Sequence, residues 1–196
     1  MTGWRHARSE RLWLDAVSAT DLDGVHAIHA DPATWTHFPA GRHVSPEMTA
    51  GKIDQMVEQW SADGLGYWGV RESAGGPVVG VAGCAVPAGF AWWNLYYRFA
   101  VSAQGRRYAA EVARRAIEAA HDVAPDRPVL AYLLESNVAS RRTAERLGLR
   151  EVWRGPDRDN PDPAAVRIVY LDRDPDDELT RRVEEFCRAR SGTAAG

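Results

Sequence analysis

The spacing of apolar residues changes several times along the chain, and each change marks an expected element. Residues 11–18 alternate apolar and polar positions, which is typical of a half-buried strand. Helical spacing follows Asp21, a suitable cap, and stops at Asp31 before a proline. A second helix is predicted from the cap Ser45 to Gly64, with apolar residues on one face at Ile53, Met56, Val57 and Trp60. We therefore expect one strand and then two helices at the start of the chain.

Short β-like runs and helical runs fill the rest of the chain. Three β-like runs separated by the turns SAGGP and PAG predict an antiparallel meander: Tyr67–Glu72, Val78–Val86 and Ala91–Val101. A helix with Tyr108, Val112, Ala116 and Ala120 on one face comes next. The remaining elements are a strand at Val129–Leu134, a helix at Asn137–Leu147, strands at Glu151–Arg154 and Val166–Leu171, and a helix with Leu179, Val183 and Phe186. This order predicts a mixed α+β fold.

Length and composition favour one compact domain over residues 1–174, followed by a C-terminal helix and flexible tail over 175–196. Hydrophobic residues make up 45% of the chain, so it has enough apolar surface for a core. The net charge of -3 gives no large positive field, and we expect no nucleic-acid partner.

The two cysteines, Cys84 and Cys187, lack zinc-site spacing and are far apart in sequence, which favours a reduced, cytoplasmic setting. No signal peptide or membrane-spanning apolar run is present, so no membrane partner is expected. His26 and His29 lie three residues apart on a predicted helix, but without a third nearby ligand a packed pair is favoured over a metal site. We expect no metal.

The segment from Phe99 to Glu111 carries the strongest chemical signal. A glycine-containing turn that opens a helix directs unpaired backbone N–H groups and the positive end of the helix dipole at one place, which suits a phosphate. Gly105 permits close approach of an anion, and Arg106 and Arg107 add positive charge. The same residues also fit an ordinary turn with solvated arginines.

The sequence QGRRYAAE in this segment resembles the pyrophosphate-binding loop of the GNAT superfamily of acetyltransferases. The positions in register are Gln104, Gly105, Arg106, Tyr108, Ala109 and Glu111. Arg107 departs from the pattern, because the family form has its second glycine there. The longer side chain must turn outward or contact the ligand.

A second segment, NVASRRTAERLGL, looks like a helix of the ribosomal-protein N-acetyltransferase branch of that superfamily. Its matching positions are Asn137, Ser140, Arg142, Glu145, Leu147 and Gly148. Taken alone, Asn137 is a helix cap and Gly148 a helix terminator. The two motifs together carry the resemblance, which extends over roughly residues 10–173.

The resemblance implies a GNAT fold: a mostly antiparallel sheet of about seven strands, splayed between strands 4 and 5, flanked by about four helices and a C-terminal helix. It implies that acetyl-coenzyme A lies where the strand ending at Val101 diverges from the strand ending near Glu135. The peptide groups of Phe99, Ala100 and Val101 would bind the pantetheine arm. Backbone N–H groups of Gln104, Gly105, Arg106, Arg107, Tyr108 and Ala109 would bind the pyrophosphate, while Asn137 would contact pantetheine and Arg142 the nucleotide.

Acetyl transfer to an amine requires a neutral amine, a stabilised oxyanion and a protonated leaving thiolate. By resemblance, the N–H near Val101 stabilises the oxyanion and Ser140 serves the departing sulfur. Many related enzymes have a tyrosine acid four residues later, where this chain has Ala144. Ser140 or water must then protonate the thiolate, or it leaves unprotonated.

The general base is open at this stage. Asn94 matches a position where a carboxylate often removes the amine proton through water, and an amide cannot act as that base. Other candidates are Glu135, Asp157, Asp159, His37 and His43, each of which also fits a surface or loop role. The amine could also lose its proton to solvent.

Two further features leave alternatives open. Trp92, Asn94 and Tyr96 would share one face of a strand, where they either line an acceptor pocket or fill a core. The substitutions at Asn94, Ala144 and Arg107 also fit a non-catalytic acyl-CoA sensor. The preferred hypothesis is an N-acetyltransferase for a protein N-terminus or small amine, acting as a monomer or homodimer.

Overall fold

The structure is a computed structural model that describes residues 3–158 and 160–189. Contacts divide the chain after Arg127 into two compact units. Each unit is described by itself. Asp159, one of the candidate bases, and residues 190–196 of the predicted tail lie outside the described residues.

The first unit is built on five antiparallel strands that pair in chain order. They are β1 (His6–Arg8), β2 (Trp13–Ala16), β3 (Tyr67–Arg71), β4 (Val78–Ala85) and β5 (Trp93–Phe99). The pairing of β4 with β5 places Gly83 opposite Tyr96 and Ala85 opposite Asn94. The predicted meander is therefore confirmed, whereas β1 was not anticipated from the sequence.

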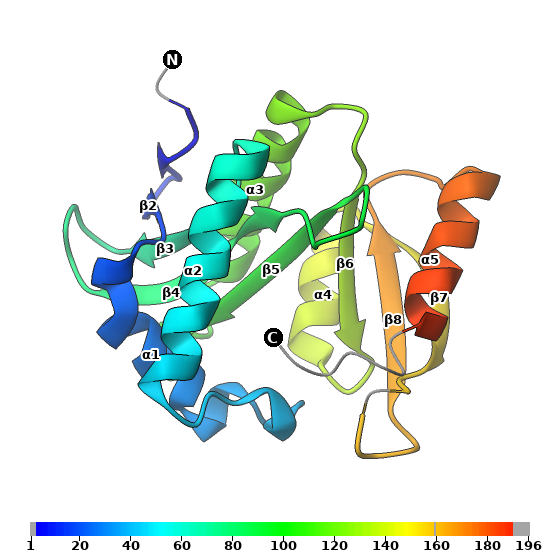
Figure 1. The fold of residues 1–196 in the computed structure, drawn as a ribbon, viewed down its shortest axis with the longest axis horizontal. Coiled ribbons are helices and arrows are strands. Elements are labelled where there is room, and N and C mark those ends of the chain that lie inside the picture. The colour runs from blue at the N-terminus through cyan, green and yellow to red at the C-terminus, as the bar shows by residue number, and fades with distance from the viewer. Residues whose placement is uncertain (1–2, 159, 190–196) are drawn as a thin grey trace. The chain divides into compact units, whose positions relative to one another are not determined.

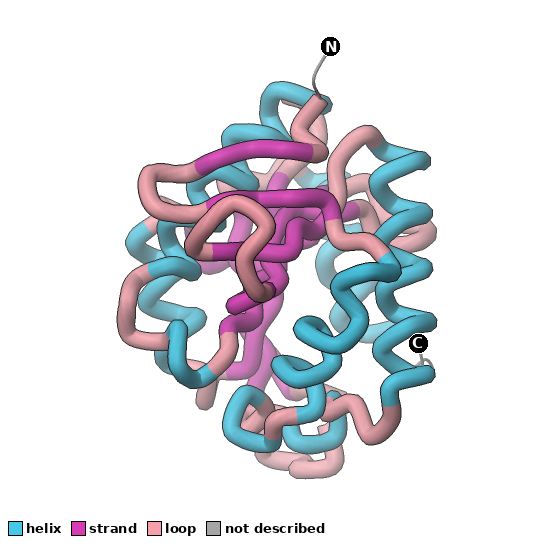
Figure 2. The backbone as a smooth tube through the Cα atoms, turned by 90° about the vertical axis from the view of Figure 1, so that its left-hand side faces the viewer, coloured by secondary structure: helices cyan, strands magenta, loops and turns pink. Residues whose placement is uncertain are grey.

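Three α-helices cover the two faces of these strands: α1 (Leu22–Ala30), α2 (Pro46–Asp63) and α3 (Tyr108–Val123). Figure 1 shows α1 and α2 on the near face of the strands and α3 on the far face, and the side view in Figure 2 shows helical segments on both sides of the strands. Short 3-10 turns occur at Ala19–Asp21, Pro32–Thr34, Pro39–Gly41 and Val101–Ala103. Both faces of these strands thus carry helices.

Local sequence sets the ends of α2. The Ser45 side chain accepts a hydrogen bond from the N–H of Met48, and Pro46 occupies the first helical turn, where its missing N–H costs nothing. At the other end Gly64 adopts a left-handed conformation with φ of 72°, which stops the helix as predicted.

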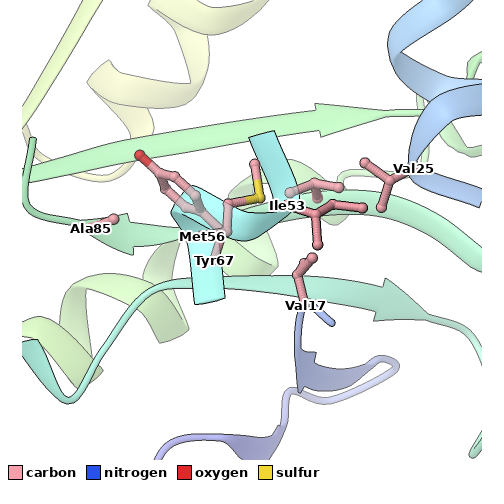
Figure 3. Packing of buried hydrophobic residues seen from close by; sticks show 7 residues of the cluster. Val17, Val25, Ile53, Met56, Tyr67 and Ala85 are labelled. Atoms are coloured by element: carbon pink, nitrogen blue, oxygen red, sulfur yellow. The ribbon is translucent and has the colours of Figure 1, made fainter. Parts of the chain in front are cut away.

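A buried apolar cluster joins α1 and α2 to the strands below them. Figure 3 shows Val25 of α1, Ile53 and Met56 of α2, and Tyr67 and Ala85 of the strands converging in this cluster. Tyr96, which shares one face of β5 with Asn94, also packs against this cluster.

The second unit has three antiparallel strands and two helices. These are β6 (Val129–Leu134), α4 (Val138–Arg146), β7 (Arg150–Pro156), β8 (Val166–Leu171) and α5 (Asp177–Ala189), and β8 pairs with both β6 and β7. Phe186 of α5 packs edge-on against Tyr132 of β6, with ring centroids 5.4 Å apart. The predicted C-terminal helix therefore packs on the strands of this unit.

The mixed α+β class is confirmed, and among the described residues the α-helices are those that were expected. The predicted division at residue 174, the splay between the fourth and fifth predicted strands and the oligomeric state stay predictions. None of the described helices combines the length and the apolar character that a membrane span requires.

Candidate functional site

The turn between β5 and α3 has the backbone conformation expected of an anion-binding loop. After β5 ends at Phe99, a 3-10 turn spans Val101–Ala103, and α3 begins at Tyr108. Gly105 has φ of 75° and Arg107 has φ of 64°, both in the left-handed region. Arg107 is the only described non-glycine residue with positive φ, so the chain keeps there the geometry that the family's glycine favours.

These conformations leave a row of backbone donors without acceptors. Within the described residues, no acceptor takes the N–H groups of five consecutive residues at the start of α3: Gly105, Arg106, Arg107, Tyr108 and Ala109. They precede a helix of 16 residues, whose dipole adds partial positive charge at this end. The turn can therefore donate several hydrogen bonds to one anion.

The peptide groups before this turn are only partly open. The N–H of Ala100 donates to the Val79 carbonyl at 2.9 Å, and the Phe99 carbonyl accepts from the Gln104 amide at 3.1 Å. The N–H of Val101 has no acceptor within the described residues. Of the three peptide groups expected to bind an extended ligand, Val101 thus offers a donor directly, while the Phe99 carbonyl is engaged by Gln104.

Side chains behind the turn hold it to the N-terminal strands. Glu111 on α3 accepts hydrogen bonds from the Ser9 hydroxyl at 2.6 Å and from the N–H of Arg11 at 2.8 Å. Burial alone would raise the pKa of the Glu111 carboxyl, but the hydrogen bonds from Ser9 and Arg11 outweigh it and lower that pKa. Glu111, which matches the family pattern, therefore anchors the first turn of α3.

Arg106 is held beside the turn by two contacts. Its guanidinium forms an ion pair with Glu72 and lies 4.6 Å from the centroid of the Tyr108 ring. Tyr108 donates a hydrogen bond to the same Glu72 carboxylate at 2.9 Å, and burial together with this bond raises the pKa of its phenol. Arg107 is exposed.

The second predicted set lies together on α4. Asn137 caps the helix, because its Oδ1 accepts the N–H of Ser140 at 3.1 Å, and Gly148 ends it with φ of 79°. Ser140 is half-buried and Arg142 is exposed. Ala144, which stands where related enzymes have a tyrosine, is only 1% exposed, so a larger side chain would have to displace its neighbours.

Asn94 is buried at 9% exposure, and its Nδ2 donates to the Tyr67 hydroxyl at 3.0 Å. Its Oδ1 has no hydrogen-bond partner within the described residues. A buried acceptor without a donor is costly, so the position favours a ligand that brings an N–H group.

The predicted alternative bases that the structure describes lie in different places. Glu135 forms an ion pair with Arg154, and Asp157 is paired with Arg167 at 2.7 Å. His37 is half-buried in the connection between α1 and α2. Both carboxylates are thus engaged by arginines.

The last candidate base, His43, belongs to a cluster of three histidines that sequence reasoning did not assemble. His26 and His43 each place Nδ1 2.8 Å from the Thr49 hydroxyl, and the rings of His43 and His29 lie 4.7 Å apart. We call His26, His29 and His43 the histidine cluster. His43 approaches the other two only when the connection between α1 and α2 folds back.

Hydrogen bonds define the state of His29. Its Nδ1 donates to the Val25 carbonyl at 2.9 Å, so Nε2 is the acceptor for the Tyr96 hydroxyl at 3.0 Å. Burial lowers the pKa of His29 to about 3 and also lowers that of His43. His29 and His43 are therefore neutral at pH 7. Within the described residues no group of three or more potential ligands could hold a metal ion.

Comparison with known proteins agrees with the family resemblance of the two sequence motifs. Residues 11–150 match the family described as acetyltransferase (GNAT) domain. A GNAT-family acetyltransferase from Bordetella pertussis is 22% identical with a TM-score of 0.69, and covers 85% of this chain and 98% of its own.

Two further solved structures are similar in fold. The ribosomal-protein-S5-alanine acetyltransferase from Vibrio fischeri is 14% identical with a TM-score of 0.68, over 89% of this chain and 98% of its own. The microcin C7 self-immunity acetyltransferase, solved with acetyl-CoA and AMP, is 11% identical with a TM-score of 0.67. The match covers 83% of this chain and 92% of that protein. At these identities the likeness concerns the fold.

Proposed function

The chain belongs to the GNAT acetyltransferase family, and we propose that it transfers an acetyl group from acetyl-CoA to a primary amine by direct attack in a ternary complex. The observation that carries the proposal is the row of N–H groups from Gly105 to Ala109 without acceptors. A diphosphate is the anion that can accept several such bonds at once.

The residues present fit this cofactor. A Cβ placed on Gly105 would meet no atom within 4 Å, so the space beside this residue of the turn is open. We propose that Gln104 to Ala109 hold the diphosphate and that Phe99, Ala100 and Val101 hold the pantetheine arm. Asn137 and Arg142 are assigned to pantetheine and nucleotide from the family resemblance.

Bound acetyl-CoA supplies the acetyl group as an activated thioester. The unpaired N–H of Val101 is suited to stabilise the oxyanion, and Ser140 is assigned to protonate the departing sulfur. Asn94 cannot take a proton from the amine, but its unpaired Oδ1 can accept an amine N–H and orient the nucleophile. The C–N bond forms as the C–S bond breaks, the amine loses its proton to solvent, and Ser140 regains a proton from solvent.

A primary amine is the acceptor class that we propose, either on a protein N-terminus or on a small molecule. The name of the Vibrio fischeri neighbour, which refers to an alanine of a ribosomal protein, supports a protein N-terminus as one acceptor. The substitutions at Asn94, Ala144 and Arg107 support the second candidate, a sensor that binds acyl-CoA without turnover. Release of free coenzyme A with a panel of amines separates the two.

We expect the substitution Gly105→Val to weaken acetyl-CoA binding by roughly tenfold or more, on the order of 1.4 kcal/mol. A β-branched residue is strained at φ of 75°, and its methyl groups enter the open space beside the backbone donors. Isothermal titration calorimetry measures the change.

Gly75 provides the matched control. It has φ of 65° in an exposed turn between β3 and β4, and a Cβ there also meets nothing within 4 Å. Gly75→Val therefore introduces similar strain away from the loop and should bind acetyl-CoA like the wild type. Equal affinity of the Gly105 and Gly75 variants would overturn the assignment of the loop.

Restoring the family's glycine at position 107 tests whether Arg107 impairs the loop. Arg107 already has φ of 64°, so Arg107→Gly removes left-handed strain and raises unfolding stability by at most about 1 kcal/mol. We expect acetyl-CoA affinity to stay within about twofold, because the backbone keeps its shape. A large loss of affinity would instead assign the Arg107 side chain to the ligand; calorimetry and urea unfolding provide both values.

A further inference from the structure

Arg98 is a half-buried cation in the first unit, on the same face of β5 as Asn94 and Tyr96. Its guanidinium carbon lies 3.3 Å from the centroid of the Trp35 ring, and Nε donates to the Tyr96 hydroxyl at 2.9 Å. Nη1 donates to the Thr34 carbonyl. These neutral partners fix the plane of the guanidinium without neutralising its charge.

Arg98 differs from the other half-buried arginines among the described residues, because no described carboxylate is paired with it. Every other half-buried arginine described lies within 4.0 Å of a carboxylate: Arg71, Arg115, Arg127, Arg141, Arg167 and Arg173. No carboxylate in residues 3–158 or 160–189 forms an ion pair with Arg98. Because a partly desolvated charge is costly unless it is paired, this position favours an anion supplied from outside the chain.

The titratable groups on the elements beside Arg98 include two histidines, Lys52 and Asp31. The His29 and His43 rings are neutral at pH 7 because burial lowers their pKa, and the positive charges of Arg98 and Lys52 lower it further. Asp31, the carboxylate at the end of α1, accepts the N–H of Ala33 at 2.8 Å. Tyr96 accepts from Arg98 and donates to His29, so its hydroxyl proton is also engaged.

We propose that Arg98 binds an anionic group of the acceptor, so that the substrate class is an amine that also carries a carboxylate or a phosphate. The inference rests on the proposed function, since it describes the acceptor of that reaction. Arg98 keeps N–H donors beyond the two that contact Tyr96 and Thr34, and a guanidinium held flat against an indole is preorganised for two parallel bonds to anionic oxygens. Asn94 on the same face would take the amine.

A binding experiment tests Arg98 without requiring turnover. The side-chain ¹⁵Nε resonance of Arg98 is assigned by its loss in Arg98→Lys, and is then followed while sodium acetate or sodium phosphate is added against sodium chloride at equal ionic strength. We expect a saturable shift with at least one oxyanion, and the arm that responds more strongly distinguishes carboxylate from phosphate. An unchanged Nε resonance in both arms would overturn the inference.

Kinetics with matched acceptors test the consequence for specificity. A series of ω-amino carboxylates of increasing length and the corresponding ω-aminoalkyl phosphates are compared with their neutral amides and alcohols. We expect kcat/KM to be at least tenfold larger for the anionic member of the preferred pair. Arg98→Gln should abolish that preference, and Arg98→Lys should retain part of it.

Arg114→Gln is the control, because it removes one positive charge from an exposed position on α3. It should keep the preference for the anionic acceptor. Thermal unfolding of each variant confirms that it is folded. Equal kcat/KM for anionic and neutral acceptors would contradict the inference while leaving the acetyltransferase proposal intact. Failure of the wild type to bind acetyl-CoA would contradict that proposal, whereas the Nε titration would still decide whether Arg98 binds anions.

Discussion

Replacing Ser140 by alanine is expected to lower kcat about a hundredfold while the affinity for acetyl-CoA stays within about twofold. The hydroxyl is half-buried in the first turn of α4, and its backbone N–H is fixed by the Asn137 cap at 3.1 Å. Proton donation to the leaving sulfur matters only as the thioester breaks, so its loss affects the transition state more than the bound ground state. Steady-state kinetics and calorimetry separate the two quantities.

Ser61 supplies a matched control for this substitution. It is an exposed serine on α2 whose hydroxyl donates to the Val57 carbonyl at 3.2 Å, so Ser61→Ala makes the same chemical change in another helix. Its kcat should equal that of the wild type. If Ser140→Ala also keeps its full kcat, Ser140 is not the proton donor. Water then protonates the sulfur, or the thiolate leaves unprotonated.

The sequence predicted the loop between β5 and α3 well because its signals are local. Glycine at position 105, two arginines and the start of a helical apolar face lie within a few residues of one another. The unexpected feature was that Arg107 adopts φ of 64°, which is uncommon for a residue with a Cβ. Ser9 and Arg11 hold Glu111 and with it the loop. This contact could not be inferred from neighbouring residues, since about a hundred positions separate the partners.

The features that sequence reasoning missed depend on contacts between distant residues. His26 and His29 were considered as a pair on one helix, yet the ring 4.7 Å from that of His29 belongs to His43. The hydroxyl partner of His29 is Tyr96 on β5. Arg98 reads in sequence as an ordinary polar residue of a strand. Its lack of a carboxylate becomes visible only when the fold places Trp35 and Thr34 around it.

For Asn94, the sequence predicted the position on the strand but not the contacts of the side chain. Its match to a carboxylate position raised the question of which base the chain uses, and periodicity placed it correctly on one face of β5 with Tyr96. The hydrophobic pattern could not predict the hydrogen bond from Asn94 to Tyr67 or the unpaired Oδ1 of Asn94. Both depend on how β3 approaches β5 across β4. Because an amide cannot act as a base, the unpaired Oδ1 supports our proposal that Asn94 is a positioning group.

Acid should destabilise the protein through His29. The ordinary pKa of a histidine is 6.5, whereas burial lowers that of His29 to about 3 in the folded chain. The unfolded chain therefore takes up a proton first as the pH falls, so the contribution is complete above about pH 6.5 and is lost progressively toward pH 3. Between pH 7.5 and pH 5 this one group should remove about 2 kcal/mol from the free energy of unfolding.

Urea unfolding at the two pH values tests this contribution with two variants. His29→Gln loses stability at pH 7.5, because the bonds to Val25 and Tyr96 are lost, but its further loss on acidification should shrink by about 2 kcal/mol. Thr34→Val is the control: it removes a hydrogen bond to the Ile28 carbonyl at 2.8 Å without removing a titrating group, so it should keep the wild-type pH dependence. If His29→Gln loses as much stability on acidification as Thr34→Val, the neutral buried imidazole is not the source of the acid sensitivity, and His43, whose pKa burial also lowers, becomes the group to replace next.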